Sequence, residues 1–253
     1  MNINLNGRVA VITGATGGIG SAIAKEFYDS GATVVLNGRS IEKLETLAHN
    51  LVTGGTFHDA ERIKCVSLDL SCAGATTQLV SETRDSFKKI DILVNNAAMI
   101  DGGLIIQTDK NFSERMMLMN YTVPFLLTRE ALGYMKKQRW GRVINMTSIS
   151  GQYGDRGLVA YAASKSALTA FTKTVAEEYG KYCITANCVA PGIIDTPVTN
   201  MMKSEYKVDM IKRIPVKRLG KPSEVAALTV FLSSERAAYI NGQEIAINGG
   251  LYR

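Results

Sequence analysis

Apolar and polar residues alternate along the chain in blocks that predict strands and helices in turn. Short apolar runs rich in β-branched residues occupy residues 9–13, 33–37, 63–70, 90–97, 141–148, 184–190 and 243–248. Segments with helical spacing of apolar positions separate them, at residues 19–31, 40–51, 75–89, 110–138, 160–180 and 222–234. Strands of this kind that alternate with helices need both faces of their sheet covered. The order therefore predicts an α/β fold: a doubly wound, Rossmann-type parallel sheet of about seven strands with helices on both faces.

The same pattern predicts a single domain over residues 1–253, because neither a linker nor a repeat interrupts it. Ser40 is expected to cap the second helix. Residues 52–62 are longer than the other connections and are expected to form an enlarged surface loop. Residues 191–221 begin irregularly and become basic and helical, and we expect them to form a mobile lid over the substrate.

The sequence TGATGGIG, residues 13–20, links the first strand to the first helix. In such a turn Gly14 permits the tight bend, Gly18 lets a pyrophosphate approach the backbone, and Gly20 permits close packing of helix on strand. The helix amino terminus then offers free N–H groups and partial positive charge to the phosphates. The turn predicts a dinucleotide site, and the alternative is a merely flexible connection.

The second strand ends in LNGRS, residues 36–40, where NAD-binding folds place a carboxylate for the adenine ribose. No carboxylate occurs there. Arg39 can instead make a forked, charge-assisted contact with a 2′-phosphate. This favours NADPH over NADH, and the alternative is an exposed arginine that precedes a helix.

Tyr161 and Lys165 are four residues apart, which places them on one face of a helix, and Ser148 follows the preceding strand. A lysine cation beside a phenol is expected to lower the phenol's pKa toward the working range. A serine hydroxyl there could hold a substrate oxygen. The set suits proton-coupled reduction of a carbonyl, although a surface Tyr–Lys pair would have the same spacing.

Pro124 follows Asn120 by four residues within the long helical segment. Because proline has no N–H, the main-chain carbonyl of Asn120 loses its helical partner, and the helix should kink there. The freed carbonyl could hold a water. A packing kink without function is the alternative.

Composition is ordinary for a globular protein, with 46% hydrophobic and 21% charged residues and a net charge of +6. The basic residues form two clusters: seven lie between Lys203 and Lys221, and four, Lys136, Lys137, Arg139 and Arg142, surround Trp140. Each cluster is either a solvated face or a docking surface for an acidic carrier or a phosphate-bearing substrate. We expect no nucleic-acid partner.

Several functions are disfavoured by what the sequence lacks. No apolar run approaches the about 18 residues needed to span a membrane. The cysteines at 65, 72, 183 and 188 have neither CxxC spacing nor a histidine partner, so we expect no metal site. They are expected to be free, buried thiols, which indicates a cytoplasmic protein. His49 and His58 lie in polar sequence and are expected to be solvated.

Taken together, the motifs resemble the short-chain dehydrogenase/reductase family over essentially the whole chain. They occur in the family's order: TGATGGIG at 13–20, DLS at 69–71, NNAA at 95–98, Asn120, Ser148, YAASK at 161–165, PGIIDT at 191–196 and NGG at 248–250. Ala98 departs mildly from the glycine that is usual in the family.

The resemblance implies a role for each matching residue. Tyr161 would be the general acid/base, Ser148 would hold the substrate carbonyl, and Lys165 would tune the tyrosine and contact the nicotinamide ribose. Asn120 would anchor a relay water through its main-chain carbonyl. The cofactor-binding set it implies is Gly14, Thr16, Gly17, Gly18, Ile19, Gly20, Arg39, Asp69, Leu70, Asn96, Tyr161, Lys165, Ile194 and Thr196.

Within the family, the chain looks most like the β-ketoacyl-ACP reductases of fatty acid synthesis. This implies NADPH as the reductant, acyl carrier protein as the substrate carrier, and a homotetramer. Two positions depart from that pattern: Gly17 stands where many NADP-dependent members carry Arg or Lys, and Tyr182, beside Lys181, stands where a basic residue is common. The alternatives are a family member that acts on an acyl-CoA, sugar, polyol or steroid-like ketone, and a non-enzymatic nucleotide-binding scaffold.

Overall fold

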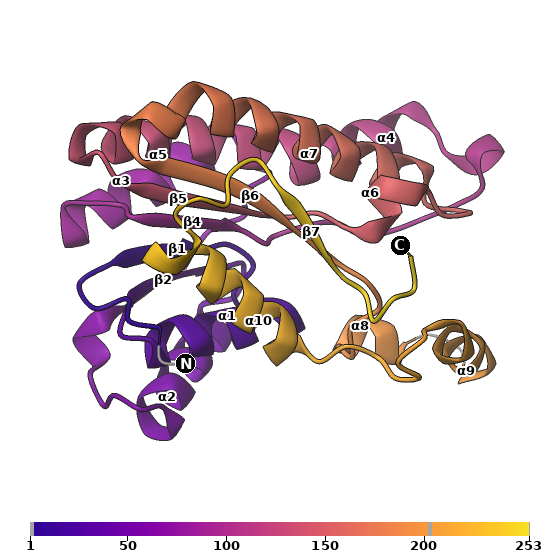
Figure 1. Cartoon of the computed structure of the whole chain (residues 1–253), viewed down its shortest axis with the longest axis horizontal. Coiled ribbons are helices and arrows are strands. Elements are labelled where there is room, and N and C mark those ends of the chain that lie inside the picture. Colours follow the sequence, from indigo (N-terminus) through magenta and orange to yellow (C-terminus); the bar gives the residue numbers. More distant parts are fainter. Residues whose placement is uncertain (1–2, 202–203, 253) are drawn as a thin grey trace.

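Seven parallel strands form one sheet, as the sequence pattern predicts (Figure 1). The structure is a computed structural model that describes residues 3–201 and 204–252. The sheet order is β3-β2-β1-β4-β5-β6-β7, so the chain starts in the middle and winds outward in both directions. The strands are β1 Val9–Ile12, β2 Thr33–Gly38, β3 Ile63–Ser67, β4 Ile92–Asn95, β5 Gly141–Met146, β6 Ile184–Pro191 and β7 Glu244–Ile247.

Helices cover both faces of the sheet. One face carries α1 (Gly18–Asp29), α2 (Ile41–Gly54) and α10 (Pro222–Leu232), and the other carries α3 (Ala75–Phe87), α5 (Val123–Gln138) and α7 (Val159–Tyr179) (Figure 1). Ile12 of β1 pairs with Leu36 on one side and Val94 on the other, and all three side chains are fully buried. The sheet is thus the middle of three layers, and a separate apolar core lies on each side of it.

The long helical segment breaks beside Asn120, as the position of Pro124 predicts. It consists of α4 (Lys110–Met117), a π-helical turn η3 (Leu118–Thr122) and α5, with Pro124 in the first turn of α5. The backbone N–H of Val123 donates to the carbonyl of Leu118, five residues earlier. A π turn of this kind is a known cause of a helix bend and occurs often at functional sites.

The connection at residues 52–62 is partly ordered by α2, which runs to Gly54, and it is fastened to the domain. The hydroxyl of Tyr28 donates to the carbonyls of Phe57 (2.7 Å) and Asp59 (3.0 Å). The Arg62 guanidinium lies 4.3 Å from both the Tyr28 and the Phe57 ring centres. The enlarged loop therefore has defined contacts. The predicted helix cap also holds, since the Ser40 side chain accepts from the backbone N–H of Lys43.

The basic cluster around Trp140 is not uniformly solvated. Arg142 is only 2% exposed, and its guanidinium lies 4.4 Å from the Trp140 ring, with Arg8 3.5 Å from the same ring. Glu235 accepts from the indole N–H of Trp140 at 2.6 Å and pairs with both arginines. Burial lowers the pKa of Arg142, and the charge of Glu235 opposes that shift. Arg142 thus supports the fold, whereas the other three basic residues of the cluster are exposed.

Expectations from composition have mixed outcomes. The four cysteines are free, but only Cys188 is buried; Cys72 and Cys183 are exposed, so the expectation of four buried thiols was wrong. His49 and His58 are exposed, as expected. Among the described residues, no helix has the length and apolarity to cross a membrane, and no group of three or more His, Cys, Asp or Glu side chains could bind a metal ion.

Candidate active site

The site residues expected from sequence gather at one edge of the sheet. Parallel strands bring their carboxyl ends to the same edge, and this edge is where ligands bind in folds of this type. α6 (Ile149–Tyr153), which follows β5, and α8 (Pro197–Asn200), which follows β6, lie at the same end of the molecule (Figure 1). Directly after the first six strands come the glycine turn, Arg39, Asp69, Asn96, Ser148 and Ile194.

The glycine turn after β1 can only be built from glycine at two of its positions. Gly14 has φ +63, and a methyl group there would lie 2.9 Å from the Cα of Ala97. A methyl group at Gly20 would lie 2.1 Å from the Gly14 carbonyl oxygen. Because α1 begins at Gly18, its first backbone N–H groups have no carbonyl of the same helix to bind. The turn therefore offers a compact cradle of N–H groups to an anionic ligand.

Asn96 and Thr13 brace this turn from below. The Asn96 amide donates to the carbonyls of Thr13 (2.9 Å) and Gly14 (3.1 Å). The Thr13 hydroxyl accepts from the backbone N–H groups of Asn96 and Ala97, both at 3.0 Å. Asn96 thus shapes the cofactor cradle through the backbone. The sequence analysis missed Thr13, although its place at the end of the first strand was a usable signal.

Arg39 and Asp69 lie next to each other after β2 and β3. Arg39 is exposed, and its positive charge contributes to the lowered pKa of Asp69, for which hydrogen bonds from Ser71 are the larger cause. The Asp69 carboxylate accepts from the hydroxyl (2.6 Å) and the N–H (2.9 Å) of Ser71. Asn37, at the position where a ribose-binding carboxylate is expected, donates its amide to the carbonyls of Val66 and Leu68. The pocket therefore presents a cation beside an ionised carboxylate.

Ser148, Tyr161 and Lys165 converge beside β5, and all three are buried, with 8%, 8% and 2% exposure. Ser148 is the N-cap of α6, and Tyr161 and Lys165 lie one turn apart on α7. The Lys165 ammonium donates to the carbonyl of Met146 at 2.7 Å and lies 5.6 Å from the Tyr161 ring centre. Burial of this degree rules out the alternative of a surface Tyr–Lys pair.

Electrostatics at this site differ from the sequence expectation. Burial raises the pKa of Tyr161; a hydrogen bond with Ser148 opposes this shift, and the charge of Asp155 adds to it. Burial also lowers the pKa of Lys165 to about 8. The expectation that Lys165 lowers the pKa of Tyr161 was wrong for this geometry, because the ammonium is directed at Met146. At neutral pH Tyr161 therefore keeps its proton and can donate it.

Asn120 is fully buried in the π turn, and its side chain is occupied by hydrogen bonds. It exchanges two 2.8 Å bonds with the backbone of Met99 and donates to the Ser164 hydroxyl at 3.1 Å. Ser164 in turn donates to the Tyr161 carbonyl at 2.7 Å. Asn120 thus ties the segment after β4 to the catalytic helix. Sequence analysis missed Ser164 and Asp155, although Ser164 directly precedes Lys165.

The first part of the lid lies against the glycine turn. Ile194 is 4% exposed and forms an isolated bridge with Gly220, and Thr196 caps α8. A methyl group at Gly18 would lie 2.9 Å from the side-chain methyl of Thr196. The structure thus brings Thr196 and the turn together, as their assignment to one cofactor site requires.

A nicotinamide dinucleotide fits this set of residues. The glycine cradle suits its pyrophosphate, Arg39 suits a 2′-phosphate, and Lys165 and Tyr161 stand at the other end of the same edge. The observation that supports the fit is the cradle itself, since side chains at Gly14, Gly18 or Gly20 would fill it.

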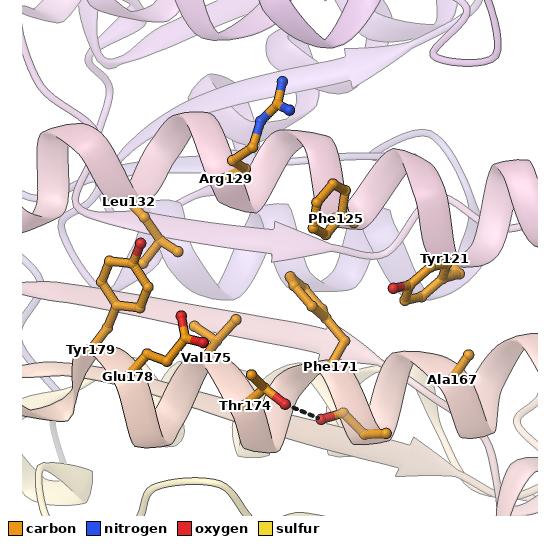
Figure 2. A pocket seen from close by; sticks show the side chains of 11 residues that line it. Tyr121, Phe125, Arg129, Leu132, Ala167, Phe171, Thr174, Val175, Glu178 and Tyr179 are labelled. Carbon is orange, nitrogen blue, oxygen red and sulfur yellow. Dashed lines mark hydrogen bonds between the residues drawn. The ribbon is translucent and has the colours of Figure 1, made fainter.

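A separate surface groove of about 670 Å³ lies between α5 and α7, away from the catalytic side chains. Figure 2 shows Phe125 and Phe171 facing each other across it, with ring centres 5.6 Å apart. Arg129 of α5 and Glu178 of α7 add one charge of each sign to its lining (Figure 2). None of Asn120, Ser148, Tyr161 and Lys165 lines this groove, so it is not the reaction cleft.

Comparison with known proteins agrees with this site. A family model described as Enoyl-(Acyl carrier protein) reductase matches residues 14–252. The chain belongs to the short-chain dehydrogenase/reductase family, whose members are oxidoreductases that bind nicotinamide cofactors.

Individual relatives cover the whole chain but carry different names. Nodulation protein G from Rhizobium sp. (strain N33) is 39% identical over 247 residues, which is 98% of each chain. The 3-oxoacyl-[acyl-carrier-protein] reductase FabG from Aquifex aeolicus (strain VF5) is 37% identical over 254 residues, which is 100% of each chain. A solved structure from Brucella melitensis, titled a short-chain dehydrogenase/reductase SDR:Glucose/ribitol dehydrogenase, has a TM-score of 0.93 at 32% identity and covers 100% of both chains.

Proposed function

We propose that the protein uses NADPH to reduce a β-ketoacyl thioester, carried on acyl carrier protein, to the β-hydroxyacyl thioester. The observation that carries this proposal is the buried set of Ser148, Tyr161 and Lys165 beside a glycine cradle for a dinucleotide. The similarity to 3-oxoacyl-[acyl-carrier-protein] reductases over the whole chain supports this choice of substrate.

Bound NADPH would supply a hydride to the carbonyl carbon, and the protein would handle the oxygen. Ser148 donates a hydrogen bond to the carbonyl oxygen and orients it. Tyr161, whose raised pKa keeps its proton at neutral pH, transfers that proton to the oxygen as negative charge develops there. Lys165, held by the Met146 carbonyl, places a positive charge near the phenolate that Tyr161 becomes. The carbonyl carbon gains a hydride and its oxygen gains a proton.

NADPH is preferred over NADH on the strength of Arg39. It is exposed after β2, where no carboxylate would repel a 2′-phosphate, and it stands beside the ionised Asp69. Gly17 contributes no second positive charge. The expected preference therefore depends on one side chain and is moderate.

The lid supplies the features that a carrier-linked substrate needs. Lys212 and Arg213 at the end of α9 (Ser204–Arg213) are exposed, and acidic partners are drawn to such charge. Met201 is 80% exposed and Val208 is 52% exposed, so the lid also presents apolar surface to an acyl chain. Two other lid cations are engaged within the chain, because Lys207 lies 3.7 Å from Asp195, and Arg218 pairs with Glu224 at 2.6 Å. Lys203 lies outside the described residues.

A different substrate for the same catalytic set is the second candidate. It is favoured by the names of two similar proteins, Nodulation protein G and a glucose/ribitol dehydrogenase, which indicate that this fold and site accompany other substrates. A non-enzymatic scaffold is disfavoured, because nucleotide binding alone requires neither the buried Tyr161 nor Lys165.

A homotetramer is the proposed assembly, and the groove between α5 and α7 is one face through which copies would pack. Its aromatic centre, formed by Phe125 and Phe171, is the kind of surface enriched at protein interfaces. Arg129 and Glu178 would allow a two-fold contact in which each copy offers both signs of charge.

The test is a comparison of kcat/KM for a β-ketoacyl-ACP, the matching acyl-CoA, a simple neutral ketone and a sugar or polyol oxidised with NADP⁺. The proposal expects the carrier-linked substrate to have the highest value and the β-hydroxyacyl thioester as product. Good activity on a sugar or polyol with none on carrier- or CoA-linked ketoacyl groups would favour the second candidate.

A further inference from the structure

The C-terminal tail, residues 248–252, runs between the lid and the helix that follows Ser148. In Figure 1 the C-terminal end of the chain lies in the gap between α6 and α8. We infer that this tail couples the lid to α6 and that Tyr252 is a positioning residue for Ser148. The inference rests on the proposed function, because it concerns the serine that holds the substrate carbonyl.

At its first end, the tail is packed tightly against the lid. Gly249 has φ +62, and a methyl group there would lie 2.7 Å from a methyl carbon of Val216 and 2.9 Å from one of Ile214. The backbone N–H of Val216 donates to the Gly249 carbonyl at 3.3 Å. Only glycine permits this approach, so a displacement of the lid just beyond α9 displaces the tail as well.

Within the tail, Asn248 fixes the direction of the chain. Its side chain accepts from the N–H of Gly250 at 2.8 Å and donates to the carbonyl of Tyr252 at 3.0 Å. Its own carbonyl accepts from the N–H of Leu251 at 3.1 Å. Three hydrogen bonds within five residues make the tail a compact turn, so that Tyr252 moves together with Asn248.

At its other end, the tail is joined to the catalytic loop by an aromatic contact. The rings of Tyr252 and Tyr153 are stacked, with centres 4.4 Å apart and planes inclined by 15°. Tyr153 is the last residue of α6, and Ser148 is the N-cap of the same helix. Because α6 has only five residues, a displacement at Tyr153 reaches the Ser148 hydroxyl within about one and a half helical turns.

The lid, the tail and α6 therefore form one chain of contacts that ends at the catalytic serine. The serine loop has a second support on α7, where Ser166 donates to the carbonyl of Gly151. Loss of the Tyr252 stack should consequently shift Ser148 without unfolding α6. Small displacements of a positioning group are costly in catalysis, with losses of up to about 10²-fold for a shift of 1 Å.

The kinetic test compares Tyr252→Ala, Tyr153→Ala and the double variant, with Tyr252→Phe as the conservative variant. Tyr239→Ala is the matched control, since Tyr239 is fully exposed. Each single alanine variant should lower kcat/KM for the ketoacyl substrate roughly tenfold, with NADPH affinity unchanged. The double variant should lose no more than either single one, and Tyr252→Phe should retain wild-type activity. Additive losses, or an equal loss in Tyr252→Phe, would overturn the inference.

A second measurement does not depend on the substrate. Hydrogen exchange of backbone amides should become faster in Tyr252→Ala both at Ile149–Tyr153 and in the part of the lid from Lys207 to Val216, and should be unchanged in Tyr239→Ala. Faster exchange confined to the tail would contradict the coupling. A wild-type protein without ketoacyl reductase activity would contradict the proposed function, and the exchange result would still decide the role of Tyr252.

Discussion

Two walls of the same cleft are built in opposite ways. The catalytic wall, formed by β5, α6, α7 and the π turn, holds Asn120, Ser148, Tyr161 and Lys165 at 8% exposure or less, and each of them has a hydrogen-bond partner in the domain. The lid exposes charged side chains such as Lys212 and Arg213 together with apolar ones such as Met201. Buried groups with fixed partners act on any carbonyl that reaches them, whereas an exposed segment with spare charge acts on what arrives.

The difference separates the reaction from the choice of substrate. Changes in the catalytic wall should affect all substrates alike, because the oxygen of every substrate would meet the same Ser148 and Tyr161. Changes in the lid should affect substrates unequally, according to their charge and length. Each prediction below tests one side of this division, from the largest expected effect to the smallest.

Tyr161→Phe removes the proton donor and should abolish most turnover on every substrate. Loss of a general acid typically costs about 10²–10⁴-fold in rate. The ring remains in its buried site, so NADPH affinity and thermal stability should be nearly unchanged. Tyr239→Phe is the control, because that side chain is fully exposed. Near-normal kcat for Tyr161→Phe would show that another group supplies the proton.

Raising the pH should slow reduction by discharging Lys165. Burial lowers its pKa to about 8, so the ammonium is charged at neutral pH and loses its proton as the pH rises through 8. Above that point kcat/KM should fall roughly tenfold per pH unit, for a small ketone and a carrier-linked substrate alike. A flat profile between about pH 7 and 9.5 would mean that the charge on Lys165 is not required.

Arg39→Ala should reduce the preference for NADPH over NADH by about tenfold or more, because a charge-assisted hydrogen bond contributes about 1.5–3 kcal/mol. The measurement is kcat/KM for both cofactors with one carbonyl substrate. Arg139→Ala serves as the matched control, since Arg139 is also exposed but follows α5, away from the cofactor cradle. A wild-type enzyme that prefers NADH, or a preference unchanged by Arg39→Ala, would contradict the assignment.

The sequence was sufficient for the fold and for the identity of the catalytic set, because these follow from local patterns. Strand periodicity predicts all seven strands of the sheet, and Pro124 predicts the break at Asn120. The YAASK motif places Tyr161 and Lys165 one helical turn apart whatever surrounds them.

What the sequence could not predict depends on burial and on contacts between distant segments. The pKa of Tyr161 is raised because burial outweighs its hydrogen bond with Ser148, and spacing contains no measure of burial. Arg142 looks like one of four surface cations in sequence, but Trp140 and Glu235 enclose it. The stack of Tyr153 on Tyr252 joins residues about a hundred positions apart.

The central claim is that the lid selects a carrier-linked substrate for a catalytic wall that does not discriminate. The most direct measurement is kcat/KM for a β-ketoacyl-ACP and for a small neutral ketone, as a function of ionic strength, in wild type and in Lys212→Glu/Arg213→Glu. The account predicts a several-fold loss on the carrier-linked substrate at low salt that shrinks as the salt concentration rises. It also predicts an unchanged value for the small ketone, and no loss on either substrate in Lys136→Glu/Lys137→Glu, which makes the same charge change on α5. Equal loss on both substrates, or a selective loss only in the α5 variant, would contradict it.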